Sequence, residues 1–270
     1  MPFSLSTETE AFAPAHLIAG SPAQRLILLC DHASNALPSG YGDLGLSRAH
    51  LERHIAYDIG AAQVTRRLSA LLDAGAALAG FSRLLIDPNR GEDDPTLVMR
   101  VSDGAIIPGN AKVGPVEIAS RVERFWRPYR RACVGLVEAA LASDRVPVLL
   151  GIHSFTPTFK GRARPWSCGV LWDRDPRLAG PLIEGLRAEG VTVGDNEPYD
   201  GALKNDSMYE LSSARGIPGA LIEIRQDELG APEQSEAWAQ RLARILPSIL
   251  ARPETERIEV FGSRADLNPG

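Results

Sequence analysis

The residues with the clearest capacity for chemistry are two histidines that each stand at the end of an apolar run. His32 comes shortly after the apolar run at residues 25–30, and His153 directly follows the run at residues 146–152. Short apolar runs of this kind predict buried strands, and open α/β sheets bind ligands at the carboxyl ends of their strands. Imidazole is a common zinc ligand, and a catalytic zinc site usually has three protein ligands and one open position. The pair therefore indicates a metal site, with hydrogen bonding to the backbone as the structural alternative for each ring.

Glu223 is the third notable residue, because it interrupts the apolar strand predicted at residues 219–225. A carboxylate buried in such a strand without a partner costs several kcal/mol. It therefore needs either a chemical role or a cationic partner, for which Arg215 and Arg225 are the candidates. Beside a metal site, Glu223 would act as a general base and later as an acid towards the leaving nitrogen.

The third metal ligand is less evident from the residue types alone. Asp58 stands near the start of a predicted helix, from which its carboxylate can point back over the sheet edge. That position also suits a simple favourable interaction with the helix N-terminus. Asn35 and His54 are the alternatives, although a neutral amide is a poor zinc ligand. We expect the metal to be held by His32, Asp58 and His153.

Two arginines stand at the end of another predicted strand or just after it, and both are candidates for contacts with substrate. Arg90 is expected to clamp a substrate carboxylate through both of its terminal nitrogens, and Arg83 to do the same or to polarise a scissile carbonyl. The alternative for each arginine is a structural ion pair. Tyr199 and Arg162, in two later loops, are weaker candidates for substrate contacts.

Composition excludes several classes of function. The chain has 270 residues and a net charge of -5, and its isoelectric point near 5.6 argues against nucleic-acid binding, which favours basic proteins. The three cysteines are widely spaced and form no Cys-x-x-Cys pair, so neither a disulfide framework nor a thiolate zinc site is expected. No signal peptide is recognised, and no apolar run approaches the roughly 20 residues that span a bilayer. We therefore expect a soluble cytoplasmic protein with no membrane partner.

Apolar periodicity predicts helices and strands that alternate along the chain. Helices are expected at residues 57–73, 115–143, 176–188, 209–214 and 232–250, and strands at 25–30, 76–86, 146–152, 168–172, 191–193 and 219–225. This alternation predicts one α/β domain with a mostly parallel sheet. We expect it to occupy residues 21–251, preceded by an arm at 1–20 and followed by a loosely attached tail at 252–270. The long connections 33–55 and 91–114 are expected to be functional.

Five ordered motifs resemble those of the N-formylglutamate amidohydrolase family over residues 20–250. They are Asp31-His-Ala-Ser-Asn35, Arg83-Leu-Leu-Ile-Asp-Pro-Asn-Arg90, Ile152-His-Ser-Phe-Thr-Pro157, Gly194-Asp-Asn-Glu-Pro-Tyr199 and Ile222-Glu-Ile-Arg-Gln-Asp227. That family is similar in turn to zinc carboxypeptidases and to succinylglutamate and aspartate deacylases. The resemblance implies a mixed sheet of about eight strands with helices on both faces.

The same resemblance implies roles for individual residues. His153 looks like a zinc ligand, Glu223 like the catalytic glutamate, and Asn89 with Arg90 like a pair that binds a substrate carboxylate. The carboxypeptidase His-x-x-Glu pair is replaced by His32-Ala-Ser-Asn35, so the acidic ligand has to come from elsewhere. Carboxypeptidases carry that acid where a helix begins, which favours Asp58 here. Relatives also tend to carry a histidine that is absent from residues 211–216 of this chain.

We therefore hypothesise a hydrolase with one Zn²⁺ per chain that cleaves the amide bond of a small N-acyl amino acid, with N-formyl-L-glutamate as the leading substrate. His32, Asp58 and His153 would hold the metal. Glu223 and Arg83 would be catalytic, and a second set would bind substrate, namely Asn89, Arg90 and Tyr199. The alternatives are a deacylase or peptidase with another substrate, or a non-catalytic binder of small acidic ligands. The oligomeric state is left open.

Overall fold

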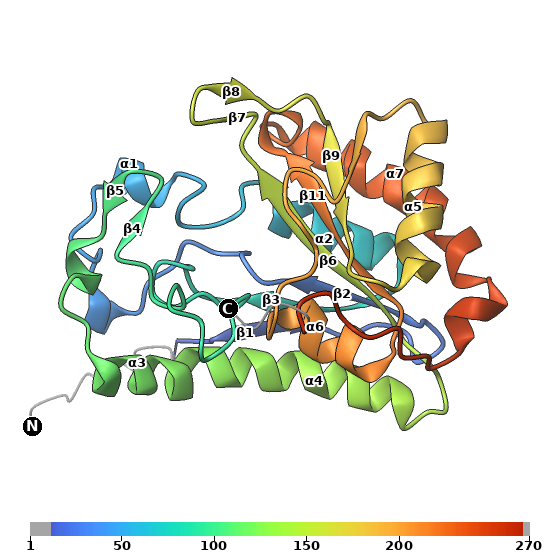
Figure 1. Ribbon diagram of the computed structural model, residues 1–270, viewed down its shortest axis with the longest axis horizontal. Helices are drawn as coiled ribbons and strands as arrows, with labels where there is room; N and C mark the ends of the chain where they lie inside the picture. The colour runs from blue at the N-terminus through green and yellow to red at the C-terminus, as the bar shows by residue number, and fades with distance from the viewer. Residues whose placement is uncertain (1–11, 267–270) are drawn as a thin grey trace, which may run out of the picture.

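The computed structural model describes residues 12–266, and its centre is a seven-stranded sheet (Figure 1). In sheet order the strands are β1 (Ala15–Ile18), β3 (Gly75–Ala79), β2 (Leu26–Cys30), β6 (Val148–Phe155), β11 (Gly219–Arg225), β9 (Cys168–Leu171) and β10 (Val193–Asp195). The β1–β3 and β11–β9 pairs are antiparallel, and the other four pairs are parallel. The predicted mixed, mostly parallel α/β sheet is confirmed, with seven strands described where about eight were expected.

Helices cover both faces of this sheet. On one face lie α2 (Ala61–Leu72), α5 (Pro176–Ala188) and α7 (Pro232–Leu250), whose apolar residues share a core with the sheet. On the other face lies α4 (Arg127–Leu141), which continues α3 (Pro115–Arg121) through a π-helical segment (Figure 1). The short helices α1 (Arg48–Leu51) and α6 (Ser207–Leu211) lie within loops. None of the helices in residues 12–266 is long and apolar enough to cross a membrane.

The central strands β6 and β11 are buried on both faces, and successive side chains alternate between the two cores. Ile222 and Ile224 face the core with α7, whereas Leu221 faces the core with α4. The same alternation places Glu223 on the α4 side of the sheet. In the parallel register of the two strands Glu223 is paired with His153, so the two side chains leave the sheet on the same face.

Several element bounds differ from those predicted. The strand that contains His153 extends to Phe155, so this histidine lies inside the strand rather than just beyond it. Strand β3 ends at Ala79, and the buried residues 81–86 form turns instead of more strand. Helix α2 begins at Ala61 instead of Tyr57.

The chain also forms two small hairpins outside the main sheet. Strands β4 (Val101–Ser102) and β5 (Ala105–Ile106) lie in the second long connection, and β7 (Thr158–Phe159) and β8 (Arg162–Ala163) follow β6. The described part of the expected arm contains the edge strand β1, while residues 1–11 lie outside the description.

The expected loose attachment of the tail is wrong for its described part. The Arg177 guanidinium donates to main-chain oxygens of Glu254 and Arg257, and Arg264 pairs with Asp173 and Asp200. These contacts hold the tail against α5 and the loop after β10. Residues 267–270 lie outside the description.

Candidate active site

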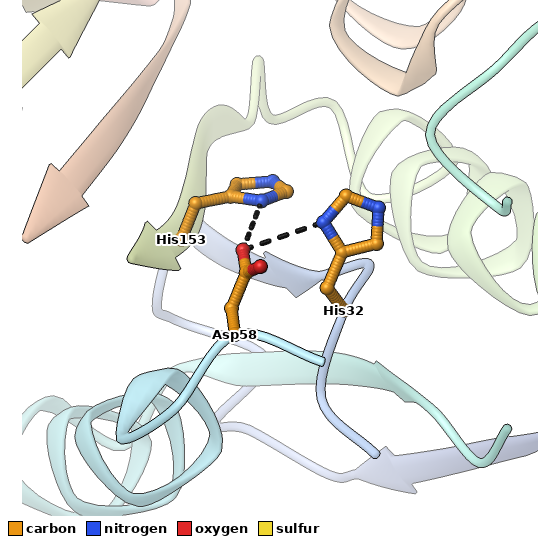
Figure 2. Close-up of side chains that lie close together, drawn as sticks. All are labelled: His32, Asp58 and His153. Carbon is orange, nitrogen blue, oxygen red and sulfur yellow. Dashed lines mark hydrogen bonds and ion pairs between the residues drawn. The ribbon is translucent and has the colours of Figure 1, made fainter. Parts of the chain in front are cut away.

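Three buried side chains from separate elements meet at the carboxyl end of the sheet (Figure 2). His32 follows β2, His153 belongs to β6, and Asp58 precedes α2. Asp58 Oδ2 lies 2.8 Å from His153 Nδ1 and 3.3 Å from His32 Nδ1. One possible ligand atom from each residue lies within 4.8 Å of the others. This cluster could hold a metal ion.

The main chain fixes the position of Asp58 within the cluster. Its amide donates to the His32 carbonyl at 2.9 Å, and its carboxylate accepts from the Ser154 amide at 3.3 Å. Gly60 then turns the chain into α2 with a φ of +84°. A Cβ at Gly60 would lie 2.5 Å from the Leu229 side chain, so both conformation and space require glycine there.

Each histidine ring also has a carboxylate at its far nitrogen. His32 Nε2 lies 2.7 Å from Asp87 Oδ1, and His153 Nε2 lies 3.4 Å from Asp31 Oδ2. Partners of this kind fix the tautomer and orientation of metal-binding histidines. Both Nδ1 atoms therefore face Asp58. Asp31 and Asp87 lie within two of the five family motifs, but neither was expected to have a role.

The cluster has an excess of buried carboxylate. Burial alone would raise the pKa of Asp58, but His32 and His153 outweigh it and hold that pKa below its usual range. The pKa of His153 is raised well above its usual value, because the nearby carboxylates of Asp31 and Asp58 outweigh the opposing effect of burial. Buried carboxylates thus surround both rings and favour a positive charge between them. A cation bound at the Nδ1 atoms would supply that charge.

Glu223 lies beside the cluster and forms no ion pair within residues 12–266. Its side chain is only 8% exposed, and its Oε2 is buried without a hydrogen-bond partner. Burial raises the pKa of this carboxyl to about 7, although the neighbouring charge of His153 opposes the shift. The alternative of a salt bridge is wrong, because Arg225 pairs with Asp227 and Glu228 and Arg215 pairs with Glu138.

Arg83 is committed to the carboxylates of the cluster. Its Nη1 lies 3.2 Å from Asp58 Oδ1, and its Nη2 lies 3.1 Å from Asp87 Oδ2. The guanidinium therefore bridges Asp58, which faces the Nδ1 atoms of both histidines, and Asp87, which lies behind His32. Its Nε is buried without a partner. The expected clamp on a substrate carboxylate would require it to leave these pairs.

Arg90 is placed differently. It is half-buried, lines the same cavity as the cluster, and has no carboxylate within ion-pair distance among residues 12–266. Asn89 also lines the cavity, and its side-chain oxygen accepts from the Ser207 amide at 3.2 Å. Tyr199 lines it from the segment after β10. Arg90 thus offers its guanidinium to a ligand.

The alternatives for the third metal ligand lie outside the cluster. The Asn35 side chain donates to the Leu51 carbonyl at 2.8 Å. His54 lines the cavity, but its Nε2 faces Asp103 Oδ2 at 3.4 Å. Arg162 is exposed on the β7–β8 hairpin and does not line the cavity.

The cavity has a volume of about 470 Å³, which is within the usual range for small-molecule sites. It contains the cluster, Glu223, and the three residues expected to bind substrate. Its remaining walls come from the end of β6, the β7–β8 hairpin and the segment 199–206. The structure therefore places all eight predicted site residues around one cavity.

Comparisons with known proteins agree with this architecture. The family model for N-formylglutamate amidohydrolase matches residues 24–229. Gene product Atu2144 from Agrobacterium tumefaciens is 31% identical, with a TM-score of 0.84 over 88% of this chain and 95% of that chain. The N-formylglutamate amidohydrolase from Ralstonia eutropha JMP134 has the same fold, at 21% identity and a TM-score of 0.68 over 87% of this chain and 99% of that chain. A search of curated proteins finds no match. The chain belongs to the N-formylglutamate amidohydrolase family, and the protein is an amidohydrolase.

Proposed function

We propose that the protein is a zinc-dependent hydrolase that converts N-formyl-L-glutamate into formate and glutamate. The observation that carries this proposal is the position of Glu223, a buried carboxyl without an ion-pair partner in residues 12–266, beside the His32–Asp58–His153 cluster in one cavity. The family match supports the same substrate.

The donor set suits zinc. Two imidazole nitrogens and one carboxylate oxygen form a frequent set of three protein ligands in catalytic zinc sites. Asp31 and Asp87 supply the outer carboxylates that such histidines usually have. A zinc ion bound there would supply Lewis acidity, which makes a water molecule more acidic and polarises the scissile carbonyl.

Glu223 performs the proton transfers. In its ionised form it accepts a proton from the attacking water as the water oxygen bonds to the formyl carbon. It then passes that proton to the amide nitrogen as the carbon–nitrogen bond breaks. A pKa raised to about 7 suits a group that both accepts and donates a proton near neutral pH.

The two arginines have different roles in binding and catalysis. Arg90, with Asn89 beside it, binds a substrate carboxylate and thereby sets the position of the amide. Tyr199 contacts the substrate from the opposite wall. Arg83 holds Asp58 and Asp87 in place with two of its five N–H donors. Its other donors stabilise the negative charge that develops on the carbonyl oxygen.

The test is release of formate from N-formyl-L-glutamate by zinc-loaded protein. Wild type should turn over, and Glu223→Gln should lose at least about a hundredfold in kcat, because the amide keeps the shape but removes the base. Glu233→Gln, an exposed change in the first turn of α7, is the matched control. Full turnover by Glu223→Gln would refute the assignment, and binding without turnover in wild type would favour a non-catalytic binder.

A further inference from the structure

The cavity extends beyond the candidate centre to a surface formed by aromatic rings. Phe155 ends β6, Phe159 lies in the β7–β8 hairpin, and Tyr199 follows β10; all three line the cavity. We refer to these three residues as the aromatic shelf. Phe159 is 42% exposed and Tyr199 is 44% exposed, whereas Phe155 is buried at 2% exposed. Large aromatic side chains left exposed together beside a site are typical of ligand-binding surfaces.

The shelf is held in place by a buried cation. The Arg164 guanidinium carbon lies 4.9 Å from the ring centres of Phe159 and Tyr199, and 5.4 Å from that of Phe155. Arg164 is only 9% exposed, and no carboxylate in residues 12–266 lies within ion-pair distance of it. Cation–π contacts with the rings thus stabilise the Arg164 charge in place of an ion pair. One cation contacts all three rings.

The shelf lies across the candidate centre from Arg90. Arg90 belongs to the segment after β3, which reaches His32 through Asp87, on the β2 side of the centre. Tyr199 follows β10, on the β9 side of Glu223. The segment that carries Tyr199 passes close to Gly169, which is paired with Glu223 in the sheet. A Cβ at Gly169 would lie 1.9 Å from the Glu197 carbonyl oxygen, so only glycine leaves room for this segment.

This arrangement orients a substrate. With its carboxylate at Arg90 and its amide carbonyl beside Glu223, an N-acyl amino acid directs its acyl group towards the shelf. A formyl group has only a hydrogen atom there and covers little of the ring surface. We propose that the aromatic shelf is an acyl-group subsite, and that besides the formyl compound the enzyme also takes N-acyl amino acids with an aromatic or larger aliphatic acyl group. Hydrolysis adds one water across the carbon–nitrogen bond and releases the carboxylic acid and the amino acid. This inference rests on the proposed amide hydrolysis.

The probes are N-benzoyl-L-glutamate and N-formyl-L-glutamate, which differ only in the acyl group. Binding of both is measured by calorimetry with Glu223→Gln protein in zinc-containing buffer, so that turnover does not interfere. We expect the benzoyl compound to bind at least tenfold more tightly, because its ring is buried on the shelf. Adding Phe159→Ala should remove most of that advantage. Adding Ile106→Ala, an apolar change at a 67% exposed position in the other hairpin, should not.

The outcomes separate the two proposals. Equal affinities for the two compounds, or an advantage that Phe159→Ala leaves unchanged, would overturn the subsite. Turnover of both compounds is measured separately with zinc-loaded wild type. If neither is hydrolysed, the proposed hydrolysis fails, and the binding data still decide whether the shelf recognises the acyl group.

Discussion

Removing the carboxylate behind His32 should weaken zinc binding more than removing the one behind His153. Asp87 accepts from His32 Nε2 at 2.7 Å and from the Asn89 amide through Oδ1, while its Oδ2 accepts from Arg83 at 3.1 Å. An asparagine side chain has only one acceptor oxygen. In Asp87→Asn its NH₂ group would therefore face a donor, either the His32 ring or the Arg83 guanidinium. Outer carboxylates of this kind contribute about 10- to 100-fold in metal affinity, or about 1.4–2.7 kcal/mol. We expect a loss in that range.

Asp31→Asn provides the internal comparison. Its Oδ1 accepts from Tyr129 and Ser207, at 3.0 and 2.7 Å, and an amide oxygen can retain both bonds. Its Oδ2 lies 3.4 Å from His153 Nε2 and forms no hydrogen bond, so the loss of affinity should be smaller, about threefold.

The assay is competition for zinc between the protein and a chromophoric chelator. Asp144→Asn is the matched control, since Asp144 is exposed and its φ of +53° is one that asparagine also tolerates. If Asp87→Asn bound zinc as tightly as wild type, the assignment of Asp87 as a support for the ligand His32 would be refuted.

Two further predictions concern buried acids. Because Glu223 works as a base only when ionised and its pKa is raised to about 7, kcat/KM should fall with decreasing pH on the acid side, at or below about pH 7 once a cation is bound nearby; a rate that rises as the pH falls would contradict this. Burial raises the pKa of Asp206 from 3.8 to about 7, so its ionisation costs the folded state stability as pH rises between those values. Asp206→Asn, which can still cap α6 at the Tyr209 amide, should therefore stabilise the metal-free protein by about 1–2 kcal/mol more at about pH 8 than at about pH 5.5. Urea unfolding measures the free energy of unfolding at each pH. An equal gain in stability at both pH values would contradict a raised pKa for Asp206.

Sequence reasoning found the site where local pattern and chemistry coincide. Glu223 stood out because an acid inside an apolar strand has to be explained, and strand alternation then places it on the face of His153. Asp58 followed from its position near the start of a helix. The inference for Glu223 needed only periodicity and the cost of burying charge, whereas the choice of Asp58 also drew on the resemblance to carboxypeptidases.

Features that depend on tertiary contacts could not be predicted in this way. The role of Asp31 and Asp87 depends on which ring nitrogen each one faces, and neither distance is encoded by sequence spacing. Arg83 was expected to reach substrate, yet its two terminal nitrogens are paired with acids from different segments. The buried run 81–86 was predicted as strand, because an apolar run does not distinguish strand from a buried turn.

The most direct test of the central claim is zinc calorimetry on metal-stripped protein. His32, Asp58 and His153 each bring one possible ligand atom within 4.8 Å of the others. We therefore expect wild type to bind one zinc ion per chain tightly, with release of protons from the histidines. His153→Ala should lose that binding, while His16→Ala, at a site on the edge strand β1, should retain it. Tight zinc binding that survives His153→Ala, or no tight site in wild type, would contradict the account.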